Sequence, residues 1–343
     1  MVDLTDRLLE ALAGGEGWIV GGALRDALLG RPVVDVDVAC REPEIVARAF
    51  ARAGGGAPFP LSERHGAWRI ALEDGRTVDF TPLAVGIEDD LATRDFTLNA
   101  MARPVGGGEL VDPFGGQADI ASRTIRAVGN GVFEADPLRL LRAVRLEDEL
   151  GFRCDDGTEE AIRRHASLVA RPAGERILGE LDRLSAEGFR RLAELGLVEA
   201  LGGSERLFDR IDVVDSSDFR LVCVFGDRLA ELPISRSLQR YARTLLRAEL
   251  LADDSPRAIH RFRRATEPWA IDALAFLGRP ELNPAIEGAR ANDPVEPLLR
   301  GDELGLPPGP EIGRLLSLIA EERAAGTLST KEEALKLVRR HSR

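Results

Sequence analysis

The sequence contains few cysteines and no long apolar run, and both shortages exclude classes of protein. Its three cysteines, Cys40, Cys154 and Cys223, are odd in number, far apart and outside any zinc-ligand spacing, so we expect reduced core thiols rather than a disulfide framework. No stretch approaches the ~20 apolar residues that a membrane span needs. Residues 1–14 carry three acids where a signal peptide would be basic and then apolar. These features predict a soluble protein of the cytoplasm with no membrane partner.

Acidic residues outnumber basic ones, and lysine is scarce. The formal net charge is −12, and lysine occurs only at positions 331 and 336. This balance excludes the uniformly basic surface that is often expected of proteins that bind nucleic acids. Residues 236–264 are an exception, because eight arginines occur there with three acids, an excess of five positive charges. Taken alone, this segment is best interpreted as the solvated face of a helix.

The 343 residues, 44% of them hydrophobic, are enough for two or more domains. Apolar periodicity in the N-terminal part predicts helices over 3–13 and 23–29 and strands over 18–20, 33–39, 68–72 and 76–81. From Asp136 onward only helical patterns remain, over 137–150, 159–169, 174–184, 188–201, 218–277, 311–325 and 331–340, with a Pro- and Gly-rich loop over 279–310. The prediction is an α+β fold with a small mixed α/β head followed by helices.

Two acids stand two residues apart in the strand predicted over 33–39. Because side chains alternate along a strand, Asp35 and Asp37 project from one face while the valines between and beside them project from the other. Two carboxylates on one face suit a shared Mg²⁺ ion. By the same alternation Asp79 lies on the corresponding face of a neighbouring strand, as a candidate third ligand. Exposed strand faces often carry two acids without a role, so this pattern alone leaves both interpretations open.

A pair of glycines precedes these acids by 13 residues. Gly21 and Gly22 end one predicted strand and lead directly into a helix, where phosphate oxygens can approach the backbone closely. Arg25, in the first helical turn, can add a charge-assisted contact to an anion. The alternative is an ordinary tight turn, with Arg25 and Asp26 forming an exposed ion pair.

Five ordered motifs extend over about 160 residues. They are Gly-Gly-Ala-Leu-Arg-Asp (21–26) with Asp-Val-Asp (35–37), Arg-Asp-Phe-Thr-Leu-Asn-Ala-Met-Ala (94–102), Asp-Pro-Phe-Gly-Gly (112–116) with Ile-Arg-Ala-Val-Gly (125–129), Asp-Pro-Leu-Arg (136–139), and Glu-Arg-Ile (175–177). In this order they resemble the motifs of the class II tRNA nucleotidyltransferases and bacterial poly(A) polymerases, within the DNA polymerase β-like nucleotidyltransferases.

The resemblance implies a polymerase β-like catalytic head (1–126), a helical neck with a base-reading motif (127–202), a helical body (203–278) and an RNA-binding helical tail (279–343). It implies Mg²⁺ on Asp35 and Asp37, with Asp79 as a further catalytic acid. Nucleotide binding is implied for Gly21, Gly22, Arg25, Arg94, Asp95, Asn99, Asp136, Arg139, Arg142 and Arg145. The implied partners are CTP, ATP and the acceptor end and elbow of tRNA, whose 3′-hydroxyl would attack the α-phosphate and release pyrophosphate.

In such enzymes the helix that starts at Asp136 reads the incoming base. An arginine donor beside an aspartate acceptor, here Arg139 and Asp136, matches the ring nitrogen and exocyclic amine that cytosine and adenine share. Uracil and guanine present the reverse pattern, so the pair would accept CTP and ATP without a template. Arg142 and Arg145 continue the row at three-residue spacing along the helix. Without the other motifs, these two arginines would be interpreted as a basic solvent face.

Departures from the family pattern keep several alternatives open. Ala135 replaces a frequent glutamate, Thr93 replaces a frequent arginine, and the interval between Asp79 and Arg94 is too short for the flexible loop of many CCA-adding relatives. Loss of that loop is associated with enzymes that add only CC. A poly(A) polymerase is disfavoured because residues 299–313 resemble the tail of tRNA nucleotidyltransferases. An inactive tRNA-binding protein is disfavoured because both Asp35 and Asp37 are present.

Overall fold

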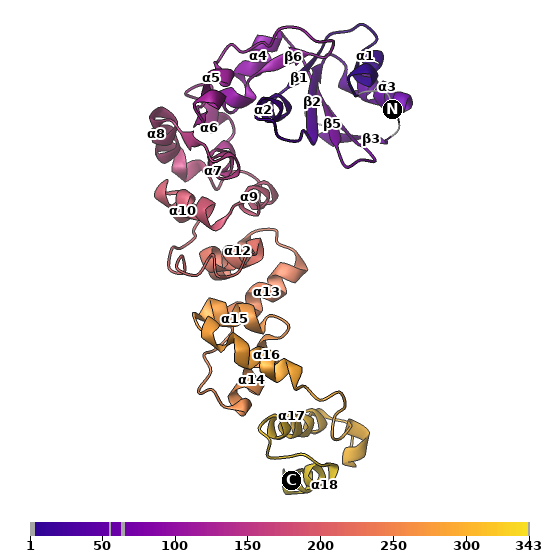
Figure 1. The fold of residues 1–343 in the computed structure, drawn as a ribbon, viewed down its shortest axis with the longest axis vertical. Helices are drawn as coiled ribbons and strands as arrows, with labels where there is room; N and C mark the ends of the chain where they lie inside the picture. Colours follow the sequence, from indigo (N-terminus) through magenta and orange to yellow (C-terminus); the bar gives the residue numbers. More distant parts are fainter. Residues whose placement is uncertain (1–3, 55, 63–65, 342–343) are drawn as a thin grey trace. The chain divides into compact units, whose positions relative to one another are not determined.

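The computed structural model describes residues 4–54, 56–62 and 66–341, and the chain forms two compact units, Met1–Leu201 and Gly202–Arg343 (Figure 1). The predicted α+β class is confirmed, because a small sheet in the first unit is followed by helices. The predicted four-part division of the chain stays a prediction. Within the described ranges, no helix is long and apolar enough to cross a membrane. Asp3, one of the acids noted near the N-terminus, lies outside the described residues.

The first unit begins with a six-stranded sheet of order β3-β4-β5-β2-β1-β6. The strands are β1 (Gly17–Val20), β2 (Asp35–Cys40), β3 (Pro58–Ser62), β4 (Ala67–Ala71), β5 (Thr77–Pro82) and β6 (Ala102–Pro104). All neighbours pair antiparallel except β2 and β5, which run parallel. The sequence reasoning missed β3, which contains two prolines, and the three-residue β6.

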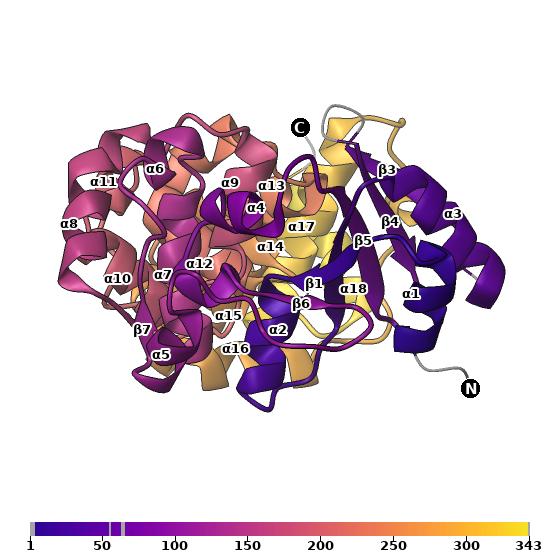
Figure 2. The same cartoon turned by 90° about the horizontal axis from the view of Figure 1, so that it is seen from above.

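One face of the sheet is covered by two helices, α1 (Leu4–Leu12) and α3 (Pro43–Gly54), which lie together on one side in Figure 1. Their apolar side chains, including Leu8 and Phe50, form a buried core with Val36, Val38 and Phe80 of the strands. Because this face takes the even-numbered residues of β2, the acids at odd positions must face the other side. Helix α2 (Gly22–Leu28) lies on that second side, as Figure 2 also shows.

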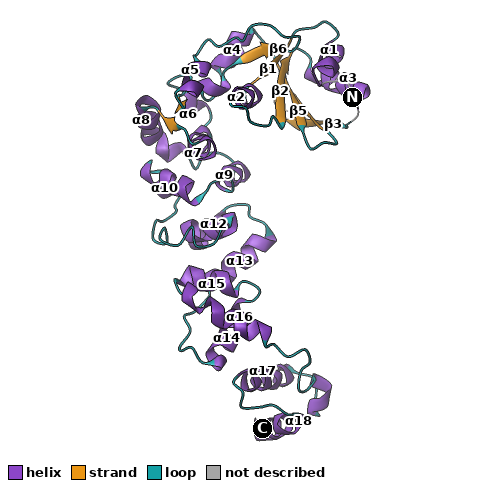
Figure 3. Cartoon of the chain, viewed as in Figure 1, coloured by secondary structure: helices purple, strands orange, loops and turns teal. Residues whose placement is uncertain are grey.

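The rest of the first unit is mainly helical (Figure 3). It contains α4 (Ile87–Ala92), the short 3-10 helix η1 (Thr97–Asn99), α5 (Gly116–Ala121), β7 (Thr124–Ile125), α6 (Val132–Ala135), α7 (Arg139–Leu150), β8 (Arg153–Cys154), α8 (Asp156–His165), η2 (Ala166–Leu168), α9 (Gly174–Leu181), α10 (Ala186–Glu194) and α11 (Leu197–Ala200). All three cysteines of the chain are free and buried, as predicted.

Two details of this region correct the sequence prediction. Strand structure does not end before Asp136, because β8 pairs in parallel with β7 across 27 intervening residues, a contact too distant for local periodicity to reveal. The base-reading helix also starts later than predicted. Asp136 has an extended backbone (φ −144°, ψ 100°), and α7 begins only at Arg139.

In the described part of the second unit, all the regular secondary structure elements are helices. It contains α12 (Ser217–Phe225), η3 (Gly226–Glu231), α13 (Arg236–Leu246), α14 (Pro256–Thr266), α15 (Ala270–Leu277), η4 (Pro280–Leu282), α16 (Asn283–Ala291), η5 (Gly301–Leu304), α17 (Pro310–Ala324) and α18 (Lys331–His341). The loop predicted over 279–310 is wrong in part, since α16 lies inside it. Its proline occupies the first turn of the helix, where no backbone donor is lost from the hydrogen-bond ladder.

Candidate active site

A cavity of about 780 Å³ opens on the side of the sheet opposite α1 and α3. Of the thirteen residues predicted to act in catalysis or to bind metal or nucleotide, all except Asp79 line it. They are Gly21, Gly22, Arg25, Asp35, Asp37, Arg94, Asp95, Asn99, Asp136, Arg139, Arg142 and Arg145. They come from α2, β2, the segment around η1, and α7, so the fold gathers side chains up to 124 positions apart into one charged hollow.

The two acids of β2 differ in their surroundings. Asp35 is exposed and its Oδ1 accepts a 2.6 Å hydrogen bond from Thr77 Oγ1, its partner across the strand pair. Asp37 is half-buried. Burial raises the pKa of Asp37, the nearby charges of Asp79 and Asp35 raise it further, and Arg94 opposes the shift. An acid with too little positive charge around it is the kind of group that a divalent cation stabilises.

Asp79 stands directly opposite Asp37 in the parallel register of β5 and β2. Asp79 is not among the residues that line the cavity. Arg69 of β4 donates a 2.7 Å hydrogen bond to each of its carboxylate oxygens. This pairing raises the pKa of Arg69. Asp79 can therefore ligate a metal only if it shares an oxygen that Arg69 already contacts, and its role as a ligand stays a prediction. The sequence reasoning overlooked Arg69, although strand alternation places it on the same face.

Gly21 is the residue before α2 and has φ +71°, a conformation that side-chain-bearing residues rarely adopt. A Cβ atom there would stand 3.3 Å from Asp37 Oδ2 and 3.6 Å from Arg94 Nη1. The bare backbone thus leaves the space between an acid and a base of the cavity open. In this gap a triphosphate could approach the metal-binding acids without meeting a side chain.

A hydrogen-bonded chain connects the helix after the glycines to the base-reading helix. Arg25 Nη1 donates to Asn99 Oδ1 (2.7 Å), and Asn99 Nδ2 donates to Asp95 Oδ1 (3.0 Å). Asp95 Oδ2 accepts from Arg142 Nη2 (2.6 Å) and Nε (2.9 Å). Burial alone would raise the pKa of Asp95, but Arg142 and the donated hydrogen bonds outweigh it and lower the pKa. This series of hydrogen bonds holds four side chains that line the cavity in place relative to one another.

The pair predicted to read the base, Asp136 and Arg139, is held from both sides. Arg139 Nη2 donates a 2.6 Å hydrogen bond to the carbonyl of Thr93, just after α4. Burial lowers the pKa of Arg139 despite the nearby acids. Asp136 Oδ2 accepts a 2.8 Å hydrogen bond from Arg176 Nη2 of α9. Arg176 belongs to the fifth sequence motif, but the motif gave no reason to expect this contact.

Arg145 differs from its neighbours in the row. It is buried, and its guanidinium is paired with Glu180 (2.5 Å) and with Glu149 (2.7 Å). Two acids therefore already neutralise its charge, which favours a role in holding α7 against α9 over direct nucleotide contact. Arg31 and Arg183 also line the cavity. The sequence reasoning missed both, because neither lies in a motif.

Metal binding at this site would depend on two carboxylates, those of Asp35 and Asp37. Within residues 4–54, 56–62 and 66–341, no group of three His, Cys, Asp or Glu side chains is arranged to hold a metal ion. Mg²⁺ does not need such a cage, because it commonly binds through one or two carboxylates together with substrate phosphates and water. Asp35 and Asp37 beside an open backbone turn fit that mode of binding.

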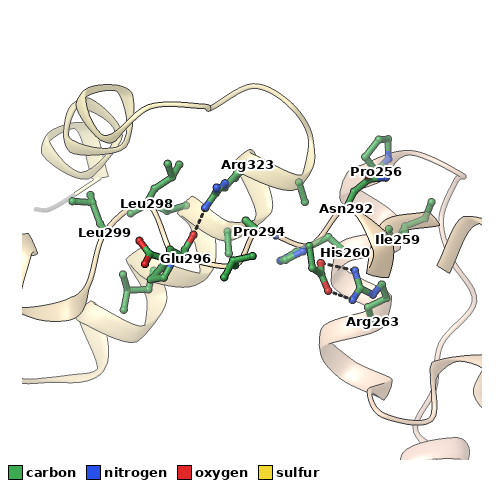
Figure 4. Close-up of a pocket in the computed structure, with 18 of the residues that line it drawn as sticks. Pro256, Ile259, His260, Arg263, Asn292, Pro294, Glu296, Leu298, Leu299 and Arg323 are labelled. Atoms are coloured by element: carbon green, nitrogen blue, oxygen red, sulfur yellow. Dashed lines mark hydrogen bonds and ion pairs between the residues drawn. The ribbon is translucent and has the colours of Figure 1, made fainter. Parts of the chain in front are cut away.

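A larger cavity of about 900 Å³ lies within the second unit, between α14, α16 and α17 (Figure 4). Its walls are mostly apolar, and two of its arginines are already engaged. Arg263 is paired with Asp293, and Arg323 Nη1 donates to the carbonyl of Glu296 at 2.6 Å. It lacks the many acids and arginines that converge on the first cavity, so the first cavity is the better candidate for phosphate chemistry.

Comparison with known proteins agrees with this geometry. The Poly A polymerase head domain family matches residues 17–83 and 69–126, and the family described as the probable RNA and SrmB-binding site of polymerase A matches 151–201. The CC-adding tRNA nucleotidyltransferase of Geobacter sulfurreducens is 48% identical over 183 residues, covering 52% of this chain and 43% of that protein. The chain thus matches less than half the length of that relative.

Two further similarities span nearly the whole chain. The A-adding tRNA nucleotidyltransferase of Deinococcus radiodurans is 32% identical over 94% of both chains. The structure of the Thermotoga maritima CCA-adding enzyme complexed with tRNA is 25% identical and superposes with a TM-score of 0.78, covering 99% of this chain and 96% of that one. With a match of this extent, added to the cavity and its motifs, the chain belongs to the tRNA nucleotidyltransferase family.

Proposed function

We propose that this chain is a template-independent tRNA nucleotidyltransferase that adds C and/or A residues to the 3′ end of tRNA from CTP and ATP, releasing pyrophosphate. One observation carries the proposal. A single cavity contains a pair of acids suited to a metal, a glycine turn beside them, and the Asp136–Arg139 pair suited to a base. Selection of the base would then fall to the side chains of Asp136 and Arg139.

The acids and the glycine turn define where the phosphates react. Asp35 and Asp37 would hold Mg²⁺, whose charge when bound favours the ionised attacking hydroxyl and stabilises the leaving pyrophosphate. The open backbone at Gly21 and Gly22 admits the triphosphate next to these acids. Arg94, 3.6 Å from the position of a Cβ at Gly21, can exchange its Asp90 partner for a phosphate oxygen.

Base selection follows from hydrogen-bond direction. Arg139 donates and Asp136 accepts, which suits cytosine and adenine and leaves unpaired groups opposite uracil or guanine. Arg176 aims the Asp136 carboxylate, and the Asp95–Arg142 contact supports the wall beside it. In this scheme residues 1–126 catalyse, 127–202 read the base, and 203–278 and 279–343 form the helical body and the RNA-binding tail. Such an enzyme works in the cytoplasm, where tRNA is processed.

A CC-only activity is the second candidate. The segment between β5 and Arg94 contains only the six-residue helix α4, which leaves no long loop there. The relative with 48% identity is a CC-adding enzyme, while the Deinococcus protein that matches the whole length adds A. The site geometry is compatible with either product, because Asp136 and Arg139 match both bases.

The product on defined tRNAs decides between these candidates. Purified protein is incubated with labelled transcripts that end at the discriminator base, after CC or after CCA, each with CTP, ATP or both. Extension of the first transcript by CCA supports full addition, and arrest after CC supports the CC-only activity. Long A tracts on any RNA would indicate a poly(A) polymerase. Absence of incorporation on every transcript, with Mg²⁺ present, would refute the proposed function.

A further inference from the structure

Four arginines form an unpaired row in the second unit. Arg236, Arg240 and Arg243 lie on α13, and Arg247 is its C-terminal cap; all four are exposed. In the part of the chain that the structure describes, none of their guanidinium groups donates a hydrogen bond or forms an ion pair. Several other arginines of the unit, among them Arg257, Arg263 and Arg290, are instead paired with an acid.

The helix fixes the direction of this row. Spacings of four, three and four residues put the four side chains on one stripe, and a rise of 1.5 Å per residue makes it about 16 Å long. The opposite face is anchored in the unit, because Leu238, Tyr241 and Leu245 are buried and the Tyr241 hydroxyl donates to Asp272 at 2.7 Å. The helix therefore cannot turn its charges inward.

Helix stability does not explain the row. Arg236 lies in the first turn of α13, where the helix dipole disfavours positive charge, whereas the dipole favours Arg243 and Arg247 at the C-terminal end. Neighbouring arginines three or four residues apart repel one another, and residues 236–248 contain no acid to offset the repulsion. These unfavourable charges persist in a chain whose net charge is −12. A bound anion with charges repeated along a line would remove the repulsion.

We propose that this row binds the phosphate backbone of a double-stranded stem of the RNA substrate. The inference rests on the proposed function, which makes tRNA the substrate, and adds the residues that grip its stem. Guanidinium groups bind phosphates in bidentate fashion, and a straight row suits a regular ladder of phosphates. An anionic membrane fits less well, because lipid binding by a basic helix needs a free apolar face and that of α13 is buried.

The experiment replaces all four arginines with glutamine, which has similar helix propensity. A matched control replaces four exposed arginines of the first unit that lie outside the cavity, Arg41, Arg52, Arg103 and Arg164. Both variants have the same net charge. A third variant replaces the α13 row with lysines and keeps its charge. Thermal melting checks that all three fold.

Binding is measured with tRNA, with a stem-loop minihelix and with a short single strand of the same 3′ sequence, across salt concentrations. For the row variant, Kd for tRNA and minihelix should rise at least tenfold near 0.1 M salt, and the salt slope should fall by about 3–4. Kd for the single strand should not change. The control should bind like the wild type, and the lysine variant should retain most of the affinity.

Equal loss in the control and the row variant would overturn the proposal, as would equal loss on single strand and stem. Binding of phosphatidylglycerol vesicles that the row variant loses, with RNA affinity intact, would reassign the row to a membrane. A failure of the proposed nucleotidyltransferase function can be distinguished from a failure of the RNA-binding proposal. The row variant should still incorporate CTP at saturating tRNA, whereas a wild type that never incorporates nucleotides would refute the function whatever the row binds.

Discussion

Arg176 of α9 donates a 2.8 Å hydrogen bond to Asp136, which lies 40 positions earlier in the chain and just before α7. The carboxylate that we propose accepts a hydrogen bond from the incoming base is therefore oriented by a side chain of a different helix. Asp136 itself has an extended backbone and is not fixed by helical geometry. Its orientation depends on Arg176 and on the hydrogen bond that its Oδ1 accepts from the amide of Leu138.

Replacing Arg176 with glutamine should weaken base selection more than catalysis. Asp136 would lose the hydrogen bond that orients its carboxylate. The kcat/KM for CTP should therefore fall roughly three- to tenfold, which corresponds to about 1 kcal/mol of transition-state stabilisation. The kcat/KM for UTP should fall less, so the ratio of kcat/KM for CTP to kcat/KM for UTP should decrease. Steady-state kinetics with all four nucleotides test this, with Arg164→Gln as a control that removes a similar pair with Glu160 outside the cavity. A uniform loss for every nucleotide would contradict a role in selection.

Replacing Asp35 or Asp37 with alanine should abolish nucleotide addition. Each change removes one of the two carboxylates available to Mg²⁺ in the cavity, and kcat should fall by roughly a thousandfold or more. tRNA binding should survive, because the arginine row proposed to bind RNA belongs to α13 and includes neither acid. Incorporation of labelled CTP is compared with Asp74→Ala, an exposed acid outside the cavity. Substantial addition by either variant would defeat the metal assignment.

Asp37→Asn should stabilise the metal-free protein. Because its folded pKa is raised, Asp37 binds a proton more tightly in the native state than when unfolded, so its ionisation destabilises the fold as pH rises through the folded pKa. A neutral amide of the same shape should raise the unfolding free energy at neutral pH, by roughly 0.5–2 kcal/mol. Thermal melting with and without Mg²⁺ is the measurement. Added Mg²⁺ with nucleotide should raise Tm in the wild type and much less in the variant.

Asp79 and Arg69 should contribute mainly to folding stability. Removing Arg69 as methionine leaves the buried Asp79 without its partner and should cost about 1–3 kcal/mol, less than for a fully buried pair because 35% of the Arg69 side chain is exposed. Urea unfolding tests this cost. If Asp79 is a metal ligand, Asp79→Asn should reduce kcat as strongly as Asp37→Asn does. A loss confined to stability would remove Asp79 from the catalytic set.

Asp95 should make the protein sensitive to acid. Its folded pKa is lowered, so the stability that it contributes is complete above the unfolded value of 3.8 and is lost as pH falls through the folded pKa. Asp95→Asn should destabilise the protein at pH 7 by about 2–3 kcal/mol and flatten the decline of Tm below pH 4. Asp254→Asn, which removes an exposed acid, should leave the profile unchanged. An acid limb as steep in Asp95→Asn as in the wild type would contradict this account.

Much of the site could be predicted because its key features are local. Strand alternation alone places Asp35 and Asp37 on one face, and a glycine pair between a strand and a helix indicates a backbone that a ligand can approach. The side-chain partnerships were not predictable in this way. Asp95 with Arg142, Asp136 with Arg176 and Asp79 with Arg69 join residues 47, 40 and 10 positions apart. The arginine excess near α13 was visible, but its exposure and lack of partners were not.

The sequence by itself determined the α+β class, the order of the motifs and the face on which the acids lie, since these depend on backbone periodicity and on residue types at fixed spacing. The tertiary structure decided which charges meet. It paired Arg145 with two acids, left Asp37 short of positive charge, and exposed the arginines of α13 without partners. The physical reason is that ion pairs and burial depend on distances between elements, and those are set by packing across the whole unit.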